Sequence, residues 1–227
     1  MIRVTENFRK IQDMLAVAAA DARRSADRIR LLAVSKKKPA EAVLEAYSVG
    51  QRDFGENFVQ EGLDKIAAVD RDDTIWHFIG HLQSNKTKAV SEHFQWVHTI
   101  DRLKIARRLS AQRPHYAADL NVCIEVNIDA EDNKSGVAAY EVEELALAVA
   151  ALPRLKLRGL MCLPAIRDDF EEQRQPFARL RELMNALNQS GMQLDTLSMG
   201  MTADYAAAIR EGATIVRIGT ALFGARE

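Results

Sequence analysis

Lys36 is the residue of this chain whose type and position first suggest covalent chemistry. It directly follows the apolar run at residues 31–35. If that run is a strand, Lys36 shares the parity of the inward-pointing Leu32 and Val34, and a lysine held there can form a Schiff base with an aldehyde. The alternative is an ordinary basic loop, because two more lysines follow and runs of charge mostly face solvent.

Two later loops each combine glycine with a hydroxyl, which are groups that bind phosphate. Ser198 and Gly200 precede a helical pattern, and Gly219 and Thr220 follow the last apolar run. A glycine lets the backbone approach an anion closely, and hydroxyl and N–H groups donate to it. One such pair alone fits a capping turn better. In a barrel, however, the loops after strands 7 and 8 often share one phosphate, so the two pairs together predict a phosphate site.

Arg217 alternates with Val216 and Ile218 in the last apolar run and would carry its charge among barrel residues. A buried charge without a partner is costly, so Arg217 needs either a carboxylate or an atom of a ligand. A reactive lysine, a phosphate site and an arginine able to meet a ring nitrogen together describe a site for pyridoxal 5′-phosphate (PLP).

Strand-like runs and helical patterns alternate along the chain and place these residues at strand ends. The strand-like runs cover residues 31–35, 52–56, 74–80, 96–100, 120–127, 155–162, 194–198 and 214–219. Helical spacing covers residues 4–28, 40–49, 58–69, 86–93, 103–112, 140–152, 169–189 and 203–211. This α/β pattern predicts one closed (β/α)8 TIM barrel over residues 1–227, with an N-terminal helix within residues 1–30 packed on it. An open doubly wound sheet is the alternative, but no GxGxxG motif follows the first strand.

The composition fits one globular domain, with 48% hydrophobic and 28% charged residues in a chain of 227. Thirty-one basic residues against 32 acidic ones give a net charge of −1, so the chain lacks the electrostatic footprint of nucleic-acid or membrane binding. Cys123 and Cys162 lie in separate apolar runs, so we expect buried thiols and no disulfide or metal site. The chain shows neither a membrane span nor a signal peptide, and we expect a cytoplasmic protein.

Several segments closely resemble the family of pyridoxal-phosphate homeostasis proteins. They are AVSKKKP, FGENFVQE, HFIGHLQSNK, SMGM and RIGTALFG, within a resemblance that runs from about residue 31 to Arg226. The combination of HFIGHLQSNK with SMGM and RIGTALFG is highly specific. His81 departs from the family pattern, in which proline is common at this position, and this puts the geometry of one loop in doubt.

The resemblance implies a barrel like the N-terminal domain of alanine racemase, which is a fold-type III PLP protein. The cofactor-binding residues that it implies are Lys36, Asn57, Ser198, Gly200, Arg217, Gly219 and Thr220. Among them, Lys36 is the residue bonded to PLP, Arg217 faces the pyridine nitrogen, Asn57 lies in the loop beside the cofactor, and the remaining four contact the phosphate. A further set of lysines without such a counterpart is interpreted as a basic rim that helps to admit an anionic cofactor: Lys37, Lys38, Lys86 and Lys134.

Three functions remain open. The leading hypothesis is a protein that holds PLP and delivers it to apo PLP-dependent enzymes, in vitamin B6 and amino-acid homeostasis, without substantial turnover. Arg217 would disfavour protonation of the ring and so weaken it as an electron sink. The resemblance implies that alanine racemase takes a second base from an additional β domain of a partner subunit. A chain that ends at Glu227 leaves no room for such a domain. We therefore expect no second base of this kind, and we expect a monomer. The alternatives are a PLP-dependent racemase or lyase of low activity and a scaffold for another phosphate ligand.

Overall fold

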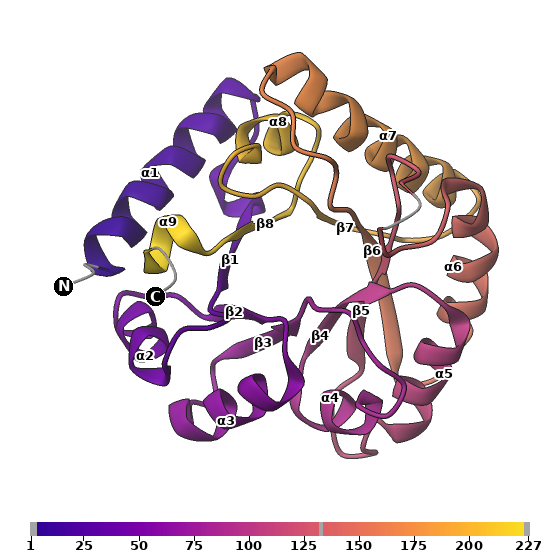
Figure 1. Ribbon diagram of the computed structural model, residues 1–227. Coiled ribbons are helices and arrows are strands. Elements are labelled where there is room, and N and C mark those ends of the chain that lie inside the picture. Colours follow the sequence, from indigo (N-terminus) through magenta and orange to yellow (C-terminus); the bar gives the residue numbers. More distant parts are fainter. Residues whose placement is uncertain (1–3, 132–133, 225–227) are drawn as a thin grey trace.

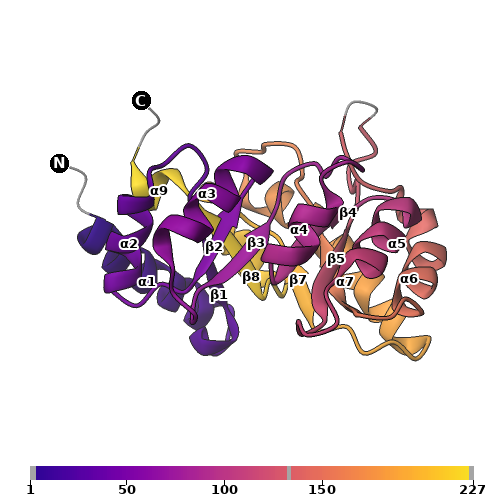
Figure 2. The same ribbon diagram turned by 90° about the horizontal axis from the view of Figure 1, so that it is seen from below.

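The computed structural model describes residues 4–131 and 134–224, and these residues form a ring of strands surrounded by helices (Figure 1). Residues 1–3, 132–133 and 225–227 of the predicted domain lie outside the described residues. The side view shows α9 (Thr220–Phe223) at the upper rim, beyond the carboxyl end of the strand that precedes it (Figure 2).

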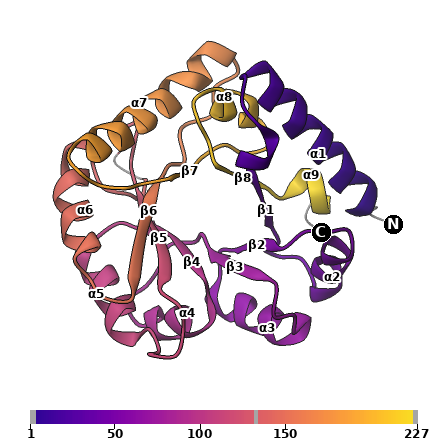
Figure 3. The ribbon, with the colours of Figure 1, turned by 180° about the vertical axis from the view of Figure 1, so that it is seen from behind.

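The described residues contain eight strands, which form a closed parallel barrel in chain order. They are β1 (Arg30–Val34), β2 (Asp53–Glu56), β3 (Ile75–Phe78), β4 (Trp96–Ile100), β5 (Leu120–Glu125), β6 (Leu155–Met161), β7 (Thr196–Ser198) and β8 (Ile215–Ile218). The ring closes between β8 and β1, where Leu32 pairs with Arg217; Figure 3 shows this closure from behind. The predicted (β/α)8 barrel is confirmed, and the alternative of an open sheet is wrong.

Helices cover the outside of the barrel because their apolar faces pack on the outward-facing strand residues. They are α1 (Val4–Asp21), α2 (Ala40–Ser48), α3 (Val59–Val69), α4 (Thr87–His93), α5 (Leu103–Gln112), α6 (Val142–Ala150), α7 (Phe170–Gln189), α8 (Tyr205–Arg210) and α9, with 3-10 turns at Ala26–Arg28 and Ala139–Glu141. α1 packs against α2, α8 and α9 and so fills the ring next to β1 and β8 (Figure 1). The predicted N-terminal helix on the barrel is therefore present.

Two details of the helices differ from the prediction. The first helix was expected to reach residue 28, but α1 ends at Asp21, because Arg23 adopts a left-handed backbone with φ 56° and Ala26–Arg28 form a separate turn. α9 was not predicted at all. With four residues it is too short to produce a helical period in the sequence.

The apolar core has two layers. The outer layer lies between strands and helices, and a small inner cluster lies inside the barrel, made of Leu32, Trp96, Cys123, Met161 and Ile215. The rest of the buried interior includes the polar side chains of His77, His98, Ser198 and Arg217. Cys123 and Cys162 are free and buried, as predicted. None of the helices within the described ranges combines the length and apolarity needed to cross a bilayer.

Candidate functional site at the barrel mouth

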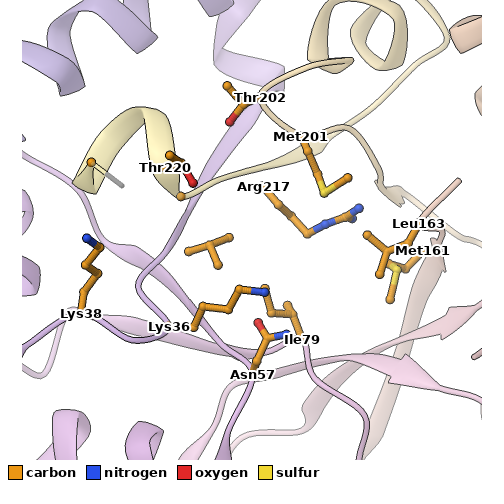
Figure 4. A pocket seen from close by; sticks show the side chains of 13 residues that line it. Lys36, Lys38, Asn57, Ile79, Met161, Leu163, Met201, Thr202, Arg217 and Thr220 are labelled. Carbon is orange, nitrogen blue, oxygen red and sulfur yellow. The ribbon is translucent and has the colours of Figure 1, made fainter. Parts of the chain in front are cut away.

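A cavity of about 200 Å³ opens at the carboxyl ends of the strands (Figure 4). It is lined by Val34, Lys36, Lys38, Asn57, Ile79, Met161, Leu163, Met201, Thr202, Arg217, Gly219, Thr220 and Gly224. Five of the seven predicted cofactor residues are in this set, namely Lys36, Asn57, Arg217, Gly219 and Thr220. The cavity thus joins residues from the first and the last strands of the barrel.

Lys36 lies in a tight turn directly after β1, where the Lys38 N–H donates to the Ser35 carbonyl at 3.0 Å. Its side chain extends into the cavity past Asn57 (Figure 4). The neighbour Lys37 has a left-handed backbone with φ 58°, and its N–H donates to the carboxylate of Glu61. The lysine that was predicted to bind the cofactor is therefore held in a defined turn, and Val34 lines the same cavity.

The turn that carries Lys36 rests on a buried ionic cluster. Lys65 on α3 donates to the Ser35 carbonyl at 2.6 Å and to carboxylate oxygens of Glu56 and Glu61, each at 2.7 Å. Ser35 also donates its hydroxyl proton to Glu56 at 2.6 Å. Burial raises the pKa of Glu56, while hydrogen bonds from Lys65 and Ser35 act in the opposite direction. Glu56 thus forms an ion pair with Lys65, and this pair holds the turn that carries Lys36.

Arg217 reaches the cavity from β8, although its side chain is almost wholly buried. Its Nη1 donates to the carbonyl and the hydroxyl of Ser198, at 2.6 and 2.9 Å, and its Nη2 donates to the Cys162 carbonyl at 2.9 Å. Burial lowers the pKa of Arg217, while the charges of Asp204 and Glu125 act in the opposite direction. The hydrogen-bond partners of Arg217 are therefore neutral oxygens, and the carboxyl groups of Asp204 and Glu125 act on its charge from a longer distance.

The two predicted phosphate loops differ in how they meet the cavity. Gly219 and Thr220 line it, and a Cβ at Gly219 would lie 3.0 Å from the Val34 carbonyl oxygen, so only glycine fits there without displacement. Ser198 and Gly200 lie buried and do not line it. Their direct contact with a phosphate stays a prediction.

Thr202 supplies the cavity hydroxyl on the β7 side, and the sequence reasoning did not select it. Figure 4 shows the Thr202 and Thr220 side chains on the same side of the cavity. The signal was present, since Thr202 follows the Ser198–Gly200 segment within the same loop. That loop is shaped by Asp204, whose carboxylate accepts from the Met201 N–H at 2.6 Å.

Two further polar side chains near the mouth, those of Asn57 and Glu125, are in unusual surroundings. Asn57 Oδ1 is buried without a hydrogen-bond partner among the described residues. Glu125 ends β5 with the same parity as the inward-facing Cys123. Burial raises the pKa of Glu125 to about 7, with the charge of Asp101 acting in the same direction and Arg217 opposing it.

The lysines interpreted as a basic rim do not act as one group. Lys38 lines the cavity, whereas Lys37 and Lys86 are exposed. Lys134 pairs with Glu131 at 2.6 Å. Of the four lysines predicted to form the rim, Lys38 alone lines this cavity within the described residues.

The family model for the alanine racemase N-terminal domain matches residues 5–227. The pyridoxal phosphate homeostasis protein of Pseudomonas aeruginosa is 54% identical over 227 residues, which cover 100% of this chain and 97% of that protein.

Among solved structures, PipY of Synechococcus elongatus PCC7942 with PLP bound has a TM-score of 0.80 and 36% identity, and the match covers 92% of this chain and 100% of PipY. Alanine racemase from Corynebacterium glutamicum has a TM-score of 0.75 at 16% identity, covering 98% of this chain and 61% of the racemase. The latter likeness concerns the fold alone.

Proposed function

Because this chain belongs to the alanine racemase N-terminal domain family and, within it, to the pyridoxal phosphate homeostasis proteins, we propose that its barrel mouth binds PLP and that the protein holds and delivers this cofactor. The observation that carries the proposal is the convergence of a lysine amine, a buried guanidinium and two threonine hydroxyls on one cavity. When bound, PLP supplies an aldehyde that combines reversibly with amines.

The residues present fit this cofactor. Arg217 holds a buried positive charge with only neutral oxygen partners in the described part of the chain, which suits an anionic ligand. Asn57 Oδ1 is a buried acceptor without a hydrogen-bond partner among the described residues, so it can accept from a bound ligand. Thr202 and Thr220 offer hydroxyl donors for a phosphate, and such charge-assisted hydrogen bonds are among the stronger ones in proteins.

Each residue has a distinct proposed role. Lys36 provides the amine for the aldehyde, Arg217 faces the ring nitrogen, and Gly219, Thr220 and Thr202 surround the phosphate. Ser198 acts from beneath the cavity by accepting two hydrogen bonds from Arg217, one on its carbonyl and one on its hydroxyl.

Gly200 also acts from beneath, through packing. It has a left-handed backbone with φ 92°, and a Cβ there would lie 2.6 Å from the Ala208 Cβ. Gly200 therefore lets the β7 loop pack closely on α8.

A carrier fits the site better than a racemase. An arginine only donates hydrogen bonds, so it does not favour a protonated ring nitrogen, and the ring is a weaker electron sink. The chain is also 54% identical to a pyridoxal phosphate homeostasis protein but 16% identical to an alanine racemase. We further propose that the protein acts as a cytoplasmic monomer and hands PLP to apo PLP-dependent enzymes. The free, buried thiols of Cys123 and Cys162 are consistent with a reducing compartment.

The visible absorption spectrum of the purified protein tests PLP binding directly. Added PLP should produce a protein-bound band that saturates at one equivalent and shifts when an amino acid is added. A spectrum identical to that of free PLP would contradict the proposal. Size-exclusion chromatography with light scattering tests the monomer.

A further inference from the structure

A row of hydrogen-bonded side chains runs through the barrel interior to Ser198 and Arg217, and the proposed function gives its other members no role. It begins at Asp53 on β2, whose Oδ1 is 2.9 Å from His77 Nε2. His77 Nδ1 is 2.9 Å from His98 Nε2, and His98 Nδ1 is 2.8 Å from Ser198 Oγ. Ser198 Oγ in turn lies 2.9 Å from Arg217 Nη1. Both imidazoles are wholly buried, so neither ring contacts bulk solvent.

The two ends of this row fix the direction of every hydrogen in it. A carboxylate only accepts, and Asp53 Oδ1 also accepts from Arg30 Nη1 at 3.0 Å. A neutral His77 must then carry its one proton on Nε2, which leaves Nδ1 to accept from His98. His98 therefore carries its proton on Nε2, and its bare Nδ1 accepts the hydroxyl proton of Ser198.

The opposite end requires the same order. Arg217 has no acceptor atom, so Ser198 Oγ has to accept from it. With its own proton directed to His98, the hydroxyl keeps a lone pair for Arg217. Burial lowers the pKa of both imidazoles, most strongly for His98, which keeps each ring neutral as this order requires. Each hydrogen bond in the row therefore has one donor and one acceptor.

We propose that His98, supported by His77 and Asp53, is a positioning residue that fixes the Ser198 hydroxyl and, through it, the Arg217 guanidinium at the cavity. His98 does not line the cavity and would not touch the cofactor. This inference rests on the proposed function, because it is Arg217 that connects the row to PLP. The positioning role places the determinants of cofactor affinity on β2, β3 and β4 as well as on the strands that carry the cavity residues.

Paired replacements of His98 separate positioning from simple packing. The Oδ1 of His98→Asn can take the place of Nδ1 as the acceptor for Ser198, whereas His98→Leu fills similar space without an acceptor. We expect His98→Leu to raise the dissociation constant for PLP about fivefold, the usual effect of one hydrogen bond, and His98→Asn to stay within about twofold of the wild type. Equal affinities in all three proteins, or an Asn variant as weak as the Leu variant, would overturn the proposal.

Nitrogen-15 NMR of the imidazoles tests the same row in the protein without PLP, so it stays informative if His98→Leu does not fold. We expect a protonated Nε2 and a bare Nδ1 in both His77 and His98, with the His98 signals identified by their loss in His98→Asn. A protonated Nδ1 on His98 would overturn the positioning role. A wild-type protein that binds no PLP would instead contradict the proposed function, so the two failures are distinguishable.

Discussion

Lys65 holds Glu56 beneath the turn that carries Lys36: Nζ and Oε1 are 2.7 Å apart and both side chains are almost wholly buried. Because the same Nζ also donates to the Ser35 carbonyl, one ammonium group ties β2, α3 and the Lys36 turn together. Removing one partner of a buried pair leaves the other charge uncompensated. Replacing a member of this cluster therefore tests how much it contributes to the stability of the protein.

Replacing Lys65 by methionine should lower the free energy of unfolding by about 3–5 kcal/mol, because Glu56 would remain buried without its cation. Urea denaturation measures this change. Lys88→Met is the matched control, since Lys88 is exposed and only weakly paired with Glu92, and it should cost less than about 1 kcal/mol. A similar decrease in the free energy of unfolding in both variants would show that the buried cluster contributes no more to stability than an exposed ion pair.

The covalent bond to PLP should form on Lys36. Reduction with borohydride fixes a lysine–PLP bond, and peptide mapping should then find the label on Lys36 in the wild type and no label there in Lys36→Ala. Lys38→Ala is the control, because Lys38 lines the same cavity and is not assigned this role. A label found chiefly on Lys38 would refute the assignment.

The Thr202→Ala, Thr220→Ala double variant should bind PLP at least tenfold more weakly, because each hydroxyl contributes a hydrogen bond to a charged group worth about 1.5–3 kcal/mol. Titration of the protein-bound absorption band gives the dissociation constant. The double variant with serine at both positions keeps the hydroxyls and should retain most of the affinity. Unchanged binding without hydroxyls would place the phosphate elsewhere.

Replacing Glu125 by glutamine should change how stability depends on pH. The pKa of Glu125 rises from 4.5 to about 7 on folding, so the folded state prefers the protonated form. The free energy of unfolding of the wild type should therefore fall as pH rises from about 4.5 to about 7, by up to about 3 kcal/mol from this group.

Glu125→Gln cannot ionise and should match the wild type near pH 4.5 and exceed its stability above pH 7. Denaturation with urea at both pH values measures the difference, in which the shared histidines cancel. Exposed Glu143 provides the control, since Glu143→Gln should follow the wild type throughout. A Glu125→Gln variant with the wild-type pH dependence would contradict the shifted pKa.

Turnover should be negligible, because Arg217 does not favour a protonated ring. Incubation with L-alanine in D2O should show no racemisation near the common enzymatic range of about 1–10³ s⁻¹. Chiral analysis and α-deuterium content measure it. The loaded protein should instead reactivate an apo PLP-dependent enzyme, at a rate that a scavenger of free PLP does not abolish; rapid racemisation would refute the carrier role.

The barrel could be predicted from the sequence because each strand is a short apolar run between helical patterns, and parallel strands buried on both faces need such runs. Lys36 could be predicted for the same reason, since strand parity sets which side chains point inward. The end of α1 could not, because it depends on the left-handed backbone at Arg23.

The roles of Thr202, His77 and His98 could not be predicted for a different reason. Thr202 is exposed in a loop whose path depends on Asp204, and no periodic pattern describes such a loop. His77 and His98 are isolated residues in separate runs. Only the closed barrel brings their rings together, at 2.9 Å between nitrogen atoms.

The pairing of Leu32 with Arg217 has a consequence for synthesis on the ribosome. β1 and the Lys36 turn are made before the other seven strands, whereas β8 and Thr220 follow them, so the nascent chain has no complete site until β8 docks. A partly synthesised barrel would hold its lysine without the guanidinium and hydroxyls opposite. PLP would therefore bind only to the fully closed barrel and would stabilise that state.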